Sequence, residues 1–115
     1  MNGIIPKLSI SQTLGLVATK IYDGHEDIAL GILQEWLACN GDKPDAFMAW
    51  YELGLQFLRK EMLEAAQTAF ESTLGEGRCF PEAAFKLAEV ISARGEASNN
   101  TVNPGSANLA YHKLH

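Results

Sequence analysis

Apolar residues recur three and four positions apart over most of the chain, which is the spacing of an amphipathic helix. The pattern holds almost throughout residues 10–87, and no segment there alternates apolar and polar residues as a half-buried strand would. Short turns rich in Gly, Asn, Asp or Pro divide the periodic stretches. The pattern predicts helices at residues 10–22, 26–38, 45–59 and 63–74, and a further helix that Pro81 begins and Gly95 ends.

Residue types at the predicted helix starts agree with these boundaries. Ser9 and Gln12 have the spacing of a capping box, in which each side chain accepts a hydrogen bond from the other residue's backbone N–H. Pro44 and Pro81 suit the first turn of a helix, where a backbone N–H has no partner within the helix. Because short turns join the helices, consecutive helices must pack antiparallel. We therefore predict an all-α fold built from antiparallel helix hairpins.

One segment carries a motif that explains how such hairpins could stack. Its large and small residues are Trp50-x-x-Leu53-Gly54-x-x-Phe57, followed by Ala66-x-x-x-Phe70. The segment resembles the tetratricopeptide repeat, which forms a hairpin of two helices. The small residues at Gly54 and Ala66 let the two helices approach closely, and the large side chains fill the space around them.

Two further copies of this motif are incomplete. A shift of about 34 residues, the period of this repeat, leads from Gly54 to another small residue, Ala88. A shift toward the N-terminus aligns Ala29 with Ala66 but places Val17 where the glycine stands. We expect about three tetratricopeptide-like repeats, the first degenerate and the third partial. The alternative is a plain helical bundle in which the motif occurs by chance.

The end of the chain differs in composition from the rest. Residues 1–95 contain the periodic pattern and are predicted to form the helical domain. Residues 96–115 are predicted to be a flexible linker of small polar residues and a tail. The tail can add a short helix around Leu109, Tyr111 and Leu114.

Composition and charge exclude several classes of partner. The chain has 115 residues, of which 47% are hydrophobic, enough for one globular domain. Its 14 acidic and 9 basic side chains give a formal net charge of −5, and the basic residues are not clustered, which argues against nucleic acid as the partner. No apolar run approaches the roughly 20 residues of a membrane-spanning helix.

The same sequence predicts a cytoplasmic protein. Residues 1–7 show no basic segment followed by an apolar run, so we expect no secretory signal. Cys39 and Cys79 lie far apart and form no Cys-x-x-Cys pair, and we expect both to be reduced thiols.

The resemblance to tetratricopeptide proteins implies a concave face, built from the first helix of each pair, that receives a peptide or a helix of another protein. Carried over residue by residue, it predicts that this face contains Leu14, Ala18, Tyr22, Met48, Tyr51, Leu55, Leu58, Arg59, Phe85 and Glu89. Most of these side chains are apolar, and the Lys and Asn of the family's carboxylate clamp are replaced at Leu14, Ala18, Tyr51 and Leu55.

An apolar groove of this kind needs a cover. The cover can be an amphipathic helix of a partner, a second copy of the chain, or the chain's own residues 106–115. Alternatively, the predicted face residues belong to the core of a short stack.

A second resemblance concerns the predicted hairpin at residues 10–38. Its matching residues are Gly24-His25-Glu26, Ala29, Ile32 and Glu35-Trp36-Leu37, with Gly41 soon after. They are similar to the first hairpin of the small needle-subunit chaperones of type III secretion systems. That resemblance implies an apolar groove that wraps the C-terminal helix of a needle subunit, alongside a small co-chaperone.

The chain carries no motif of a known catalytic or cofactor site. It has no Gly-rich phosphate loop, no His-Glu-x-x-His and no Gly-x-Ser-x-Gly. His112 and His115 have one-turn spacing but no neighbouring carboxylate or cysteine, so we expect no metal site. We expect a non-catalytic interaction module without a cofactor. The alternative is a self-associating structural or regulatory protein that uses the same face as a homodimer interface.

Overall fold

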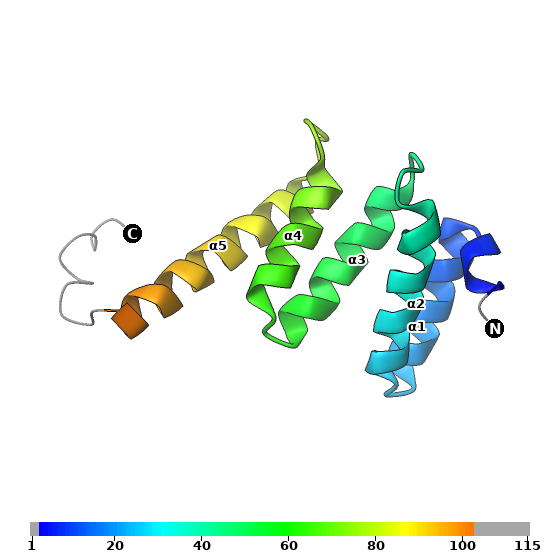
Figure 1. Cartoon of the computed structure of the whole chain (residues 1–115), viewed down its shortest axis with the longest axis horizontal. Coiled ribbons are helices and arrows are strands. Elements are labelled where there is room, and N and C mark those ends of the chain that lie inside the picture. Colours follow the sequence, from blue (N-terminus) through cyan, green and yellow to red (C-terminus); the bar gives the residue numbers. More distant parts are fainter. Residues whose placement is uncertain (1–2, 103–115) are drawn as a thin grey trace.

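The computed structural model describes residues 3–102, with side chains described through residue 96. A short 3-10 helix, η1 (Ile5–Lys7), precedes the α-helices (Figure 1). These are α1 (Ile10–Tyr22), α2 (Glu26–Asn40), α3 (Ala46–Arg59), α4 (Leu63–Leu74) and α5 (Pro81–Val102). No strand occurs in this part of the chain, so the predicted all-α fold is confirmed.

The helices form a row of antiparallel hairpins, as predicted (Figure 1). α1 pairs with α2 and α3 pairs with α4, while α2 packs against α3 and α4 packs against α5. α5 follows the second hairpin, and no further helix comes after it within residues 3–102.

Local sequence signals agree with some helix boundaries and fail at others. The capping box is confirmed, because Gln12 N donates to Ser9 Oγ at 3.0 Å and Ser9 N donates to Gln12 Oε1 at 2.9 Å. Pro81 is the first residue of α5, as predicted. The placement of Pro44 in a first helical turn was wrong, because α3 begins only at Ala46 and Pro44 lies in the turn before it.

The prediction that Gly95 ends the last helix was also wrong. α5 continues through Gly95 to Val102, so residues 96–102 are helical. A glycine inside a helix costs only about 1 kcal/mol relative to alanine, and no proline follows it before Pro104. The predicted short helix around Leu109, Tyr111 and Leu114 lies outside the described residues.

Trp36 anchors the N-terminal segment to the first hairpin. Its side chain is fully buried, and its indole Nε1 donates to the Leu8 carbonyl oxygen at 2.8 Å. One turn later, Asn40 Nδ2 donates to the Pro6 carbonyl oxygen at 3.0 Å. These bonds satisfy carbonyl groups of a segment that makes few backbone bonds of its own.

Gly54 sets the distance between α3 and α4. A Cβ atom added at Gly54 would lie 2.5, 2.7 and 2.9 Å from three atoms of the Phe70 ring. Phe70 is fully buried, and Ala66 and Ala69 are buried on the same helix. The ring therefore packs directly on the backbone of α3, which confirms that the glycine permits the close approach of the two helices.

An aromatic cluster extends this contact to the start of α5. The Tyr51 ring lies 5.9 Å from the Phe70 ring and 4.8 Å from the Phe80 ring, measured between centroids. Phe47 meets Phe80 edge to face at 5.9 Å, and the Arg78 guanidinium carbon lies 3.9 Å from the centroid of the Phe47 ring. Through these aromatic contacts, α3 packs against the connection between α4 and α5.

Replacing Gly54 with alanine should therefore destabilise the fold. The Phe70 ring is enclosed and cannot move aside freely, so we expect Gly54→Ala to lower the free energy of unfolding by about 1–3 kcal/mol. Gly31 on α2 is the matched control, since it is exposed and a Cβ atom added there would meet nothing within 4 Å.

Gly31→Ala should instead raise the free energy of unfolding by about 0.5–1 kcal/mol, because alanine favours the helix. Urea denaturation followed by circular dichroism measures both variants. Equal effects at the two positions would contradict the close-approach explanation.

Candidate partner-binding face

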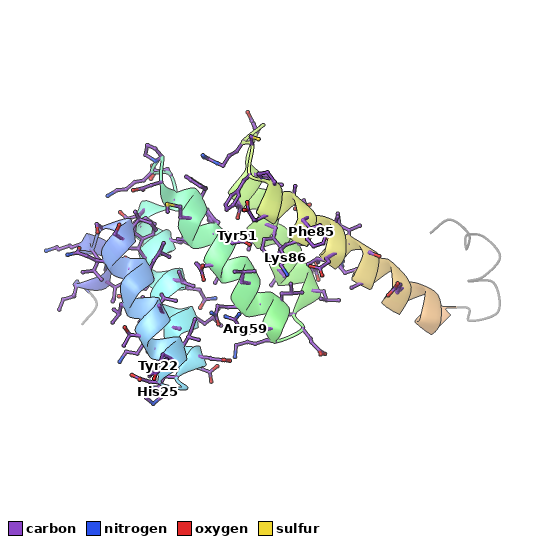
Figure 2. All side chains as sticks on the ribbon, turned by 180° about the vertical axis from the view of Figure 1, so that it is seen from behind. Tyr22, His25, Tyr51, Arg59, Phe85 and Lys86 are labelled. Carbon is purple, nitrogen blue, oxygen red and sulfur yellow. The ribbon has the colours of Figure 1, made fainter. Side chains whose placement is uncertain are left out.

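The helices α1, α3 and α5 lie on the same side of the row (Figure 2). We call this side the leading face. α1 contacts α3 directly as well as through α2, so the two leading helices line a common groove. The predicted partner-binding residues all belong to these three helices.

The groove between α1 and α3 has a volume of about 340 Å³. Its lining residues are Leu14, Val17, Ala18, Ile21, Tyr22 and Glu52. Leu14 is half-buried, Ala18 is exposed, and the Tyr22 side chain is 90% exposed at the end of α1 (Figure 2). The structure thus brings together the residues predicted from the first repeat, and we call this hollow the α1–α3 groove.

Glu52 is a groove residue that the sequence analysis did not single out. Its carboxylate is half-buried, and burial raises its pKa, an effect that the positive charge of Arg59 partly offsets. Within the part of the chain that the structure describes, no hydrogen bond or ion pair is formed by this carboxylate. The signal was present in the sequence, because Glu52 lies four residues after Met48 and three before Leu55 on one face of α3.

Gln56 follows Glu52 by one helical turn and is fully buried. Among the described residues, neither its amide nitrogen nor its amide oxygen has a hydrogen-bond partner. A buried amide without partners costs about 1–3 kcal/mol. α3 therefore carries two adjacent polar side chains whose burial does not stabilise the isolated chain.

The remaining predicted residues of α3 divide into exposed and packed side chains. Met48 is 39% exposed, and Arg59 is exposed at the end of the helix (Figure 2). Leu55 and Leu58 are half-buried against the core, and Tyr51 is held in the aromatic cluster. Tyr51, Leu55 and Leu58 therefore contribute to the packing of the helices and are only partly available on the surface.

The two predicted residues of α5 lie apart from the α1–α3 groove. Phe85 is 66% exposed, and Glu89 forms an ion pair with Lys86, with 3.3 Å between Oε1 and Nζ. Figure 2 shows α3 between Tyr22 on α1 and Phe85 on α5. The predicted residues thus occupy one face but do not form one continuous pocket.

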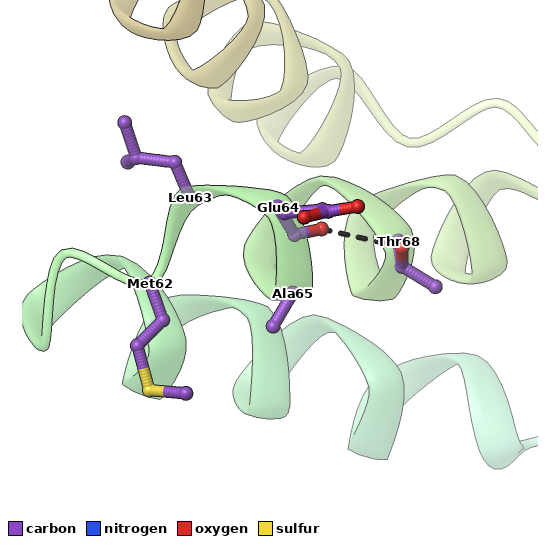
Figure 3. Close-up of a pocket in the computed structure, with 5 residues that line it drawn as sticks. All are labelled: Met62, Leu63, Glu64, Ala65 and Thr68. Atoms are coloured by element: carbon purple, nitrogen blue, oxygen red, sulfur yellow. Dashed lines mark hydrogen bonds between the residues drawn. The ribbon is translucent and has the colours of Figure 1, made fainter.

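A larger hollow lies at the start of α4 but lacks converging chemical groups. It has a volume of about 470 Å³ and is lined by Met62, Leu63, Glu64, Ala65 and Thr68. Leu63 points away from Met62 and Ala65, and the Thr68 hydroxyl donates to the Glu64 backbone carbonyl oxygen at 3.2 Å (Figure 3). This arrangement brings no acid, base or nucleophile together.

Groups that could perform metal or thiol chemistry are dispersed in the described structure. No three His, Cys, Asp or Glu side chains of this part of the chain come together as a metal site would require. Cys39 and Cys79 are both exposed, and neither is in a disulfide within the described residues. His112 and His115 lie outside them.

Comparisons of the chain with known protein families, with curated proteins and with solved structures find no match. None of the helices within residues 3–102 combines the length and the apolar character that crossing a bilayer requires.

Replacing Gln56 with methionine should stabilise the chain. Methionine has a similar volume and leaves no polar atom without a partner, so we expect a gain of about 1 kcal/mol in the free energy of unfolding. The exposed Gln34 on α2 is the control, and Gln34→Met should change stability by less than about 0.5 kcal/mol. A loss of stability in Gln56→Met, measured by urea denaturation, would show that the amide has partners in solution.

The raised pKa of Glu52 predicts a pH-dependent effect of Glu52→Gln. The folded chain holds the Glu52 proton more strongly than the unfolded chain does, so the ionised carboxylate lowers stability at neutral pH. The variant should exceed the wild type in the free energy of unfolding at about pH 7, by at most about 1 kcal/mol, because solvent screens a half-buried group. The difference should shrink as the pH falls and disappear below the ordinary Glu pKa of 4.5.

Urea denaturation of both proteins at about pH 7 and about pH 3.5 measures this difference. The control is Glu64→Gln, at an exposed acid on α4. Its difference from the wild type in the free energy of unfolding should not shrink between the two pH values as that of Glu52→Gln does. A constant difference between wild type and Glu52→Gln at both pH values would refute the role of burial.

Proposed function

We propose that the chain is a non-catalytic interaction module that binds an amphipathic helix or peptide of another protein on its leading face. The observation that carries this proposal is the α1–α3 groove, which is open, mainly apolar and bordered by the exposed Tyr22 ring. Burial of a large apolar side chain from water is worth about 1.5–3 kcal/mol. A helix that covers this groove would gain such energy from several residues at once.

The dimensions of the groove suit a helix of a few turns. α1 has 13 residues, which corresponds to about 20 Å along its axis. A partner helix of similar length would contact Leu14, Ala18 and Tyr22 at one-turn intervals. Met48 on α3 adds a further exposed apolar side chain to the same face.

The resemblance to needle-subunit chaperones suggests one specific partner, the C-terminal helix of a needle subunit, with a co-chaperone beside it. The residues that carry the resemblance build the first hairpin, since Ala29, Ile32 and Trp36 are all buried. These buried residues support a first hairpin similar to that of the needle-subunit chaperones. They do not contact a partner and so do not by themselves determine which partner binds. A cytoplasmic location belongs to the same proposal.

The second candidate is a homodimer that forms through the leading face. The observation that favours it is the exposure of a large apolar residue on α5, Phe85, which is 66% exposed on the leading face. In a symmetric dimer, Phe85 of one copy would be covered by the leading face of the other.

Filling the groove should abolish partner binding without unfolding the chain. Ala18 is exposed and lines the groove, so Ala18→Arg should leave the circular dichroism spectrum unchanged and weaken partner capture at least about tenfold. Gly31→Arg on α2 is the control, because Gly31 is also exposed, lies outside the leading face, and leaves open space for a side chain. Tagged proteins expressed in the native source and analysed by mass spectrometry provide the measurement.

Sedimentation of the purified proteins separates the two candidates. The interaction module is supported if the wild type is a monomer and if Ala18→Arg, but not the control variant, fails to capture the partner. A wild-type dimer that Phe85→Glu converts to a monomer supports the homodimer. Capture of the same partner by wild type and Ala18→Arg alike would refute the groove as the binding site.

A further inference from the structure

The floor of the α1–α3 groove combines an apolar lining with one ionisable group. Glu52 is the single charged residue among those that line it. Its carboxylate is partly withdrawn from water yet forms no ion pair or hydrogen bond with any described side chain. A carboxylate in this setting gains more from a cationic donor than an exposed one does, because the surrounding dielectric is lower.

Two cationic residues lie on the helices that form the groove, Arg59 two helical turns further along α3 and Lys20 on α1. The charge of Arg59 partly offsets the burial of the Glu52 carboxylate, but neither residue forms an ion pair with it in the described structure, so a cation of a partner can pair with it directly. On α5, Lys86 is already paired with Glu89. On α2, Asp27 is already paired with Lys60, at 2.9 Å from Oδ1 to Nζ.

We infer that the partner helix presents one Lys or Arg side chain from within its apolar face to the Glu52 carboxylate. This inference rests on the proposed function and adds the chemistry that selects the partner. The apolar rows on either side of the cation would cover Leu14, Ala18 and Ile21, while the cation would compensate the buried charge. The net charge of −5 favours the approach of such a basic helix.

The described end of α5 lies at the opposite end of the row from α1 (Figure 1). We therefore take a separate partner helix as the occupant of the α1–α3 groove.

A library of amphipathic helices displayed on phage, randomised at the positions of the apolar face, tests this inference. The library is selected separately on the wild type, on Glu52→Gln and on Glu64→Gln. The wild type and Glu64→Gln should enrich Lys or Arg at one position inside the apolar face. Glu52→Gln should enrich an apolar residue at that position.

A peptide selected on the wild type then gives the size of the effect. Replacing its enriched basic residue with methionine should weaken binding to the wild type at least about tenfold, and binding to Glu52→Gln less than about twofold. Glu64→Gln removes one negative charge at a position outside the groove. It therefore distinguishes an ion pair with Glu52 from the attraction of a basic peptide to the net negative charge of the chain.

The outcomes distinguish this inference from the proposed function. Suppose that the wild type and Glu52→Gln select the same residues, and that the selected peptides do not bind Ala18→Arg. The groove then binds helices, but Glu52 does not pair with a cation of the partner, and the inference is refuted. If no peptide is selected, or if Ala18→Arg binds every selected peptide normally, both proposals fail. A wild-type dimer that dissociates in Ala18→Arg would assign the groove to a second copy and overturn the inference.

Discussion

The packing of the Phe70 ring on the backbone of Gly54 is the contact on which the arrangement of the hairpins depends. α3 and α4 form the central hairpin, α2 packs on α3 and α5 packs on α4, so the separation of the central pair determines where both neighbours lie. The same Phe70 ring also contacts Tyr51, which in turn contacts Phe80 at the start of α5. A change at this position would therefore be transmitted along the whole row.

Two polar side chains of α3 differ from the other buried polar groups of the described structure in how they are paired. Elsewhere, buried polar side chains are satisfied, as in the bonds from Trp36 and Asn40 to backbone carbonyl groups. On α3, Glu52 and Gln56 are withdrawn from water without partners among the described residues. Gln56 is fully buried, so a partner on the surface would not reach it. Glu52 lines the α1–α3 groove, and a group that lowers stability there is expected where a surface is used for binding, because an incoming partner can compensate it.

Sequence reasoning succeeded where a local signal acts alone. The capping box at Ser9 and the position of Pro81 both follow from the N–H groups at the start of a helix, which have no partner within the helix. These groups are present whatever the helix packs against. It failed at Gly95, where a weak local preference against the helix was outweighed by helix-forming neighbours on both sides. The tail beyond Val102 lies outside the described residues, so the prediction for it stays a prediction.

The sequence by itself determined the all-α class, the order of the helices and the close approach at Gly54, because periodicity, caps and side-chain size act over short distances. Tertiary structure decided which face residues remain available. Tyr51 and Leu58 occupy the same helix as Met48 and Arg59, yet the first two are partly buried against the core while the second two are exposed. The position of Glu52 on the face of Met48 and Leu55 is present in the sequence, but its partial burial was decided only when α1 lay beside α3, since burial depends on which helices meet.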